Sequence, residues 1–164
     1  MTARVVVAAM GNEYRRDDGV GAAVVAAVAP LLDELRAPGF DATGVGPFGD
    51  PLDLLGPWDH ATLAVVVDAV RTGAAPGTVV VVDLGGPGGS EAVDRRASST
   101  HGLGVAGALR LARAVGRAPD RVVAVGIEGG DFGNGTGLSE AVDRAVGEAA
   151  ARVLDLVRSV RPCA

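Results

Sequence analysis

The chain has 164 residues, 48% of them hydrophobic, and a formal net charge of −5 at pH 7. A chain of this length buries about 70% of its unfolded surface when it folds as one unit. No linker-like stretch divides it, so we expect residues 1–164 to form a single domain. The acidic balance argues against nucleic acid as a partner, because grooves that follow a phosphate backbone need an excess of basic side chains.

Two residue types are scarce enough to exclude whole classes of chemistry. All fifteen basic residues are arginine, which rules out a Schiff-base lysine and the lysine of a phosphate-binding P-loop. The only cysteine is Cys163, which leaves no internal disulfide and no thiolate metal cluster. The first apolar run ends at Met10 and is too short for a secretory signal or a membrane span. We therefore expect a cytoplasmic protein with no membrane partner.

The first part of the chain is typical of a strand, a tight turn and a helix. An apolar run over residues 4–10 predicts the first strand, and Gly11 begins the turn. Apolar residues at helical spacing then predict a helix over residues 18–35, with Pro30 as a bend or a stop. In α/β proteins such a strand-to-helix junction commonly presents a functional site.

The middle of the chain predicts two minor elements and two strands. Residues 40–45 favour a short edge strand, and residues 50–55 a short helix begun by Asp50 and Pro51. Residues 61–67 form a continuous apolar run, typical of a strand covered on both faces, and the run ends at Asp68. The next strand, residues 78–82, follows too soon for a parallel crossover, so we expect it to run antiparallel at an edge.

The last third alternates helix, strand and helix. A Gly-rich loop leads to His101 and then to a helix over residues 105–114. Residues 121–127 predict another central strand, and a final helix with Ser139 as its N-cap runs to about residue 160. The alternation predicts a three-layer α/β/α sandwich with a mostly parallel, twisted sheet of about five strands and one antiparallel edge strand.

Asp18, Asp68 and His101 are the candidate site residues, because each follows or closes a strand or enters a helix at the edge where such sheets collect functional groups. Two carboxylates and an imidazole suit a divalent metal ion, without choosing among zinc, nickel, iron and manganese. The same three groups suit hydrolysis by a general base and water. A purely structural interpretation is equally open: Asp17 and Asp18 cap a helix, Asp68 ends a strand, and His101 caps or is exposed.

Other nucleophilic or basic residues are weaker candidates. His60 lies in a predicted surface turn before the third strand, where we expect it to be solvated. A serine triad of Ser98 or Ser99 with His101 is disfavoured, because such near neighbours rarely reach nucleophile geometry and the chain has no G-x-S-x-G motif.

Several short motifs, taken together and in order, resemble the [NiFe]-hydrogenase maturation protease family. They extend from the first strand to the last helix and so cover nearly the whole chain. The matching segments are Gly11-Asn12 with residues 17–21, residues 67–69, residues 99–103, and residues 125–128 followed by 137–139.

The resemblance implies an endopeptidase that removes the C-terminal extension of a hydrogenase large-subunit precursor after nickel insertion. It assigns catalysis and nickel sensing to Asp18, Asp68 and His101, with Asp17 as a supporting neighbour of Asp18. Nickel is then expected from the substrate and not as a metal stably held by the enzyme. The precursor is the implied partner, and we expect the enzyme itself to be a monomer.

One segment departs from the family pattern. Where the family often has an Asp-Gly-Gly-Thr-like stretch after the second strand, this chain has Gly46, Pro47, Phe48, Gly49 and Asp50. The departure bears on which hydrogenase group supplies the substrate.

Two other functions remain open from the sequence. A nickel-binding chaperone without peptidase activity would use the same three ligands. A peptidyl-tRNA hydrolase also begins with a strand and a Gly-Asn turn, but it needs a histidine shortly after the turn and a basic surface; this chain has Asp17 and Asp18 there.

Overall fold

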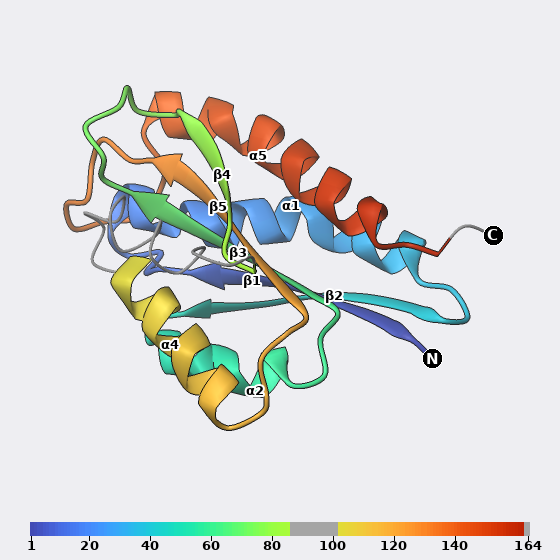
Figure 1. Cartoon of the computed structure of the whole chain (residues 1–164). Helices are drawn as coiled ribbons and strands as arrows, with labels where there is room; N and C mark the ends of the chain where they lie inside the picture. The colour runs from blue at the N-terminus through green and yellow to red at the C-terminus, as the bar shows by residue number, and fades with distance from the viewer. Residues whose placement is uncertain (86–101, 163–164) are drawn as a thin grey trace.

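A five-stranded sheet with the order β2-β1-β3-β5-β4 forms the centre of the computed structural model, which describes residues 1–85 and 102–162 (Figure 1). Four strands run parallel: β1 (Ala3–Met10), β2 (Phe40–Phe48), β3 (Leu63–Val70) and β5 (Arg121–Glu128). The edge strand β4 (Val79–Asp83) is antiparallel to β5. The predicted mostly parallel sheet with one antiparallel edge strand is confirmed.

Helices cover both faces of the sheet. The long helices α1 (Val20–Leu35) and α5 (Glu140–Ser159) lie together on one face. The other face carries the 3-10 helix η2 (Pro51–Leu54), the short α2 (Leu55–Trp58) and α4 (Gly102–Ala114) (Figure 1). This arrangement confirms the three layers. None of the described helices has the length and apolar character needed to cross a membrane.

The apolar strands alternate between two cores. In β1, Val5, Val7 and Ala9 belong to the core beneath α1 and α5, whereas Ala8 and Met10 belong to the core beneath α2 and α4. Successive side chains of a strand point to opposite faces, so a strand covered on both sides must be apolar throughout. This is why the central strands read as uninterrupted Val/Ala runs.

Helix α1 ends at Leu35, as predicted, and continues through Pro30, so Pro30 does not act as a stop. Proline in a helix interior removes one backbone hydrogen bond and costs about 3 kcal/mol. Pro30 lies on the exposed side, while Val28 and Leu32 on either side of it are buried in the core. Burial of the apolar side of α1 therefore offsets the lost bond.

Strand β2 is three residues longer than predicted and ends beside the turn that follows β1. The amide of Gly11 donates a hydrogen bond of 2.9 Å to the carbonyl oxygen of Phe48. Gly46 has a φ of +96°, and a Cβ there would lie 2.6 Å from the Ala9 carbonyl oxygen. The segment that departs from the family pattern thus packs directly on β1. The predicted short helix after it is η2, with the Asp50 carboxylate accepting the Leu52 amide at 2.9 Å.

Candidate active site at the carboxyl edge of the sheet

The four buried charged side chains of the described residues all lie at or next to the carboxyl ends of parallel strands. They are Asp17, Asp18, Asp68 and Glu128, none of them more than 8% exposed. Burial of a charge is costly unless hydrogen bonds or opposite charges compensate it. A concentration of buried carboxylates at one edge of a sheet therefore marks this edge as the candidate site.

The loop after β1, residues 11–18, folds back so that its start contacts its end. The Asn12 amide donates to Asp18 Oδ2 at 2.9 Å, and Asn12 Oδ1 accepts the Tyr14 amide at 2.9 Å. Gly11 has a φ of +119°, and a Cβ there would lie 2.1 Å from the Asp18 carbonyl oxygen. Only glycine fits this position. The Gly-Asn pair thus holds the Asp18 carboxylate in a fixed place.

Helix α1 starts close against the ends of β1 and β3. A Cβ on Gly21 would lie 2.5 Å from the Val67 carbonyl oxygen and 2.7 Å from that of Met10. The 3-10 helix η1 (Arg16–Gly19), which contains Asp18, also contacts β3. This close packing brings the Asp18 segment and the Asp68 segment to the same edge.

Asp68 lies inside β3, two residues before its end, so the prediction that it ends the strand is wrong. Strand β3 continues beyond Asp68 because Val70 still pairs with Glu128 of β5. By strand alternation Asp68 shares its face with Ala64 and Val66, which belong to the core beneath α2 and α4. The carboxylate is therefore directed to the α4 side of the sheet.

Asp17 connects two distant loops and does not cap α1. Its Oδ2 accepts the amides of Gly130 and Asp131 and the Ser139 hydroxyl, each at 2.8 Å, and its Oδ1 accepts the Ser139 amide at 2.7 Å. The N-cap of α1 is Gly19, and no side-chain hydrogen bond caps that helix. The capping interpretation of Asp17 and Asp18 is wrong because both carboxylates are occupied by loop groups.

These contacts decide the ionisation of Asp17. Burial raises the pKa of its carboxyl, but the hydrogen bonds from the Ser139, Gly130 and Asp131 amides and from the Ser139 hydroxyl together outweigh burial and hold the pKa below its ordinary value. Asp17 is therefore a charged anchor that is completely buried.

Glu128, one residue beyond the strand predicted over residues 121–127, is a second carboxylate anchor. It is the last residue of β5, and its carboxylate accepts the amides of Thr72 and Gly73 at 2.8 and 3.1 Å and the Thr72 hydroxyl at 2.8 Å. These bonds fix the chain just after β3, four residues from Asp68. A carboxylate directly after an apolar run of the sequence is the signal, and Asp68 follows the run of residues 61–67 in the same way.

Arg71 directly follows β3, and its guanidinium lies 3.8 Å from the centre of the ring of Phe132, a residue beyond β5. This cation–π contact joins the segment after β3 to the loop of residues 129–139. Together with Asp17 and Glu128, it holds the loops of the carboxyl edge to one another.

His101 lies outside the described residues, as do Ser98, Ser99 and Cys163. Helix α4 begins at Gly102, and a Cβ on Gly104 would lie 2.4 Å from Pro51 Cγ. Pro51 follows the carboxyl end of β2, so the start of α4 lies at the same edge as Asp18 and Asp68.

Within residues 1–85 and 102–162, no three metal-ligating side chains come together. His60 is 91% exposed in a turn, as predicted.

The layered sheet and the buried carboxylates at its carboxyl edge form the arrangement in which open α/β proteins place their functional sites. Residues 49–156 match the family described as hydrogenase maturation protease, HycI. This match spans more than half of the chain, and the protein therefore belongs to the hydrogenase maturation protease family.

Solved structures agree with this assignment. The [NiFe] hydrogenase maturation protease HybD from Thermococcus kodakarensis is 26% identical, with a TM-score of 0.72 over 94% of this chain and 99% of its own. A hydrogenase 2 maturation peptidase from a Thaumarchaeota archaeon is 29% identical, with a TM-score of 0.64 over 94% and 97%. The maturating endopeptidase HybD from E. coli shares the fold at 24% identity, with a TM-score of 0.74 over 95% and 93%. No curated protein matches the chain.

The predicted family and the predicted enzyme class, an endopeptidase, are thus confirmed. Neither a chaperone without peptidase activity nor a peptidyl-tRNA hydrolase finds support in these comparisons.

Proposed function

We propose that this endopeptidase removes the C-terminal extension of a [NiFe]-hydrogenase large-subunit precursor after nickel insertion. In this proposal Asp18, Asp68 and His101 bind the nickel ion that the precursor carries. The observation that supports it best is the position of Asp18 and Asp68, two buried carboxylates at one sheet edge in a chain of the maturation protease family.

The geometry of the two carboxylates suits metal recognition. Asp18 is held by the Asn12 amide, and Asp68 is set within a paired strand, so neither needs to be ordered when a ligand arrives. Preorganised ligands lose little conformational entropy on binding. Carboxylates also supply the negative charge that a divalent cation requires.

The sequence position of His101 supports its inclusion. It immediately precedes α4, the start of which packs on Pro51 at the carboxyl edge. Asp68 is directed to the same side of the sheet as α4. Imidazole nitrogen is a common donor to nickel and would complete a set of three ligands with the two carboxylates.

Nickel belongs to the substrate in this proposal. Two carboxylates and one imidazole, with no thiolate, should hold free nickel weakly, whereas nickel fixed in the precursor has its own ligands and needs only a few more. Only the metal-loaded precursor would then be positioned for cleavage. The metal would polarise the scissile carbonyl or the attacking water, and loop amides would stabilise the developing oxyanion.

The test uses purified enzyme stripped of metal, incubated in parallel with nickel-loaded and nickel-free precursor. We expect cleavage of the loaded precursor alone, observed as the loss of the C-terminal extension by mass spectrometry. Equal cleavage of both forms, or a requirement for nickel bound beforehand to the enzyme, would contradict the proposal.

A further inference from the structure

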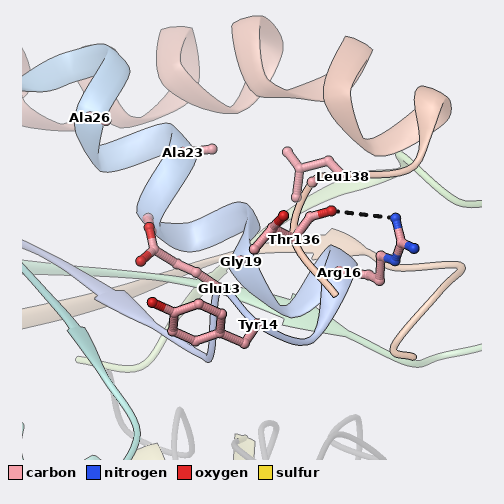
Figure 2. Close-up of a pocket in the computed structure, with 10 residues that line it drawn as sticks. Glu13, Tyr14, Arg16, Gly19, Ala23, Ala26, Thr136 and Leu138 are labelled. Carbon is pink, nitrogen blue, oxygen red and sulfur yellow. Dashed lines mark hydrogen bonds between the residues drawn. The ribbon is translucent and has the colours of Figure 1, made fainter. Parts of the chain in front are cut away.

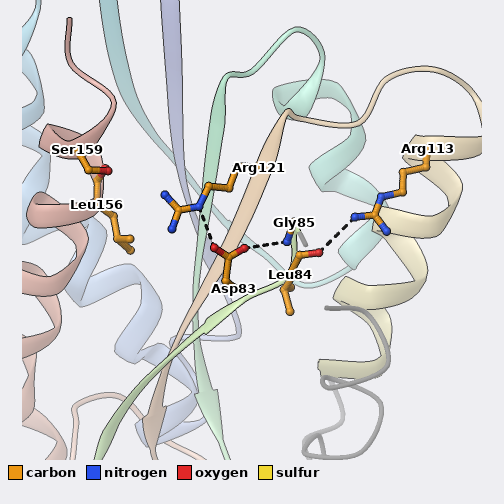
Figure 3. Close-up of polar contacts among 7 residues, drawn as sticks. All are labelled: Asp83, Leu84, Gly85, Arg113, Arg121, Leu156 and Ser159. Atoms are coloured by element: carbon orange, nitrogen blue, oxygen red, sulfur yellow. Dashed lines mark hydrogen bonds and ion pairs between the residues drawn. The ribbon is translucent and has the colours of Figure 1, made fainter. Parts of the chain in front are cut away.

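A groove of about 390 Å³ lies beside the Asp18 segment on the α1 side of the molecule (Figure 2). Its floor is a row of small residues of η1 and α1, from Gly19 to Ala26, and Leu138 forms one wall. Glu13 and Tyr14, from the same loop as Asp18, form the opposite wall. Arg16 and Gly19, which also line the groove, belong to η1, the same 3-10 helix as Asp18.

The walls of the groove are joined to each other by backbone hydrogen bonds. The Arg16 amide donates to the Gly135 carbonyl oxygen at 3.0 Å, and the Gly135 amide donates to the Tyr14 carbonyl oxygen at 2.9 Å. The Arg16 guanidinium donates to the Thr136 carbonyl oxygen at 3.3 Å (Figure 2). With the Asp17 anchor behind them, these contacts make the groove a preformed feature that a ligand need not open.

The chemistry of the groove is apolar along its floor and acidic at one end. The Glu13 carboxylate lies at the end opposite Arg16 in Figure 2 and forms no hydrogen bond or ion pair with any described residue. Tyr14 beside it is the only tyrosine of the chain and is 72% exposed. Exposed tyrosines in a rigid loop are typical of contact residues in protein recognition.

We infer that this groove binds the C-terminal extension of the precursor as a single extended segment. The inference rests on the proposed function, which requires a protein substrate whose scissile bond lies near Asp18. A groove of about 390 Å³ with a floor of small residues suits an extended chain segment with small or apolar side chains. The free carboxylate of Glu13 selects a segment with a basic side chain at that end.

Two neighbouring alanines of α1 provide a matched test. Both Ala26 and Ala27 are exposed, but only Ala26 lines the groove. Ala26→Gln places a longer side chain in the groove, and Ala27→Gln makes the same change outside it, at the same small cost in helix propensity. We expect Ala26→Gln to raise KM for nickel-loaded precursor about tenfold with kcat within about twofold of the parent enzyme. Ala27→Gln should change neither value.

A synthetic peptide with the sequence of the extension identifies the occupant. The peptide should inhibit the parent enzyme competitively and should inhibit Ala26→Gln about tenfold more weakly. Glu13→Gln should weaken peptide binding about fivefold at low salt and less at high salt. Glu34→Gln, the same change at an exposed glutamate in α1 that does not line the groove, should have no effect.

The outcomes separate this inference from the proposed function. If the parent enzyme does not discriminate nickel-loaded from nickel-free precursor, the proposed function fails whatever the groove variants do. If it does discriminate but Ala26→Gln behaves like Ala27→Gln, the groove is not a substrate site. If Ala26→Gln raises KM while the peptide fails to compete, another part of the precursor occupies the groove and the assignment to the extension is overturned.

Discussion

Asp17 and Ser139, 122 residues apart in the chain, are joined by two hydrogen bonds: the Asp17 carboxylate accepts the Ser139 amide at 2.7 Å and the Ser139 hydroxyl at 2.8 Å. Ser139 is the N-cap of α5, but its hydroxyl does not cap its own helix. The negative charge of Asp17 lies instead at the positive end of the α5 dipole. One buried carboxylate thereby connects the loop that carries Asp18 to the start of the last helix.

Replacement of this carboxylate should destabilise the fold. In Asp17→Asn the side-chain amide would face backbone N–H donors, and the charged hydrogen bonds would be lost. We expect the free energy of unfolding to fall by about 3 kcal/mol, measured by urea denaturation. Asp155→Asn, the same change at an exposed position of α5, is the control and should stay within about 0.5 kcal/mol of the parent. Equal stability of the two variants would contradict the anchoring role.

The anchor should also make stability depend on pH in the acid range. The Asp17 pKa is lowered in the folded protein relative to its ordinary value of 3.8. A lowered pKa stabilises the folded state above the unfolded-state pKa, and this stabilisation is lost as pH falls through the folded-state pKa. The stability difference between the parent and Asp17→Asn should therefore be constant from neutral pH to about pH 5 and shrink below pH 4. A difference that grows on acidification would refute this assignment.

Glycine at position 21 should be required for close packing, whereas glycine at position 147 should not. A Cβ on Gly21 would meet the carbonyl oxygens of Val67 and Met10, and a Cβ on Gly147 in α5 would meet no atom within 4 Å. We expect Gly21→Ala to lower the free energy of unfolding by about 2 kcal/mol. Gly147→Ala should raise it by about 0.5 to 1 kcal/mol, because alanine favours the helix. Thermal denaturation of both variants tests this pair.

The proposed nickel-binding residues should affect processing more than folding. Asp68→Asn and His101→Ala should each reduce processing of nickel-loaded precursor by at least about 100-fold. Asp18→Asn should do the same, but the hydrogen bond from Asn12 weakens in this variant, so its unfolding must be measured alongside. Asp155→Asn again provides the control. Parent-like processing by the His101 variant would remove that residue from the proposed site.

Local sequence determined most of the sheet. The Val/Ala runs of β1, β3 and β5 predict central strands because a strand buried on both faces must be apolar at every position. The short connection before β4 likewise predicts its antiparallel course at the edge, because a parallel crossover needs more chain. The turn that begins at Gly11 follows from local sequence in the same way.

Tertiary structure decided what each carboxylate does. Asp17 and Asp18 have the local sequence of a helix cap, yet the partners of Asp17 lie more than 110 residues away, where no local pattern can indicate them. Glu128 likewise anchors Thr72 only because β3 and β5 are neighbours in the sheet. Pro30 remains inside α1 because Val28 and Leu32, on either side of it, are buried in the core. The chain itself thus determines which residues become strands and helices, whereas the energy of a buried charge depends on the donors that the complete fold brings to it.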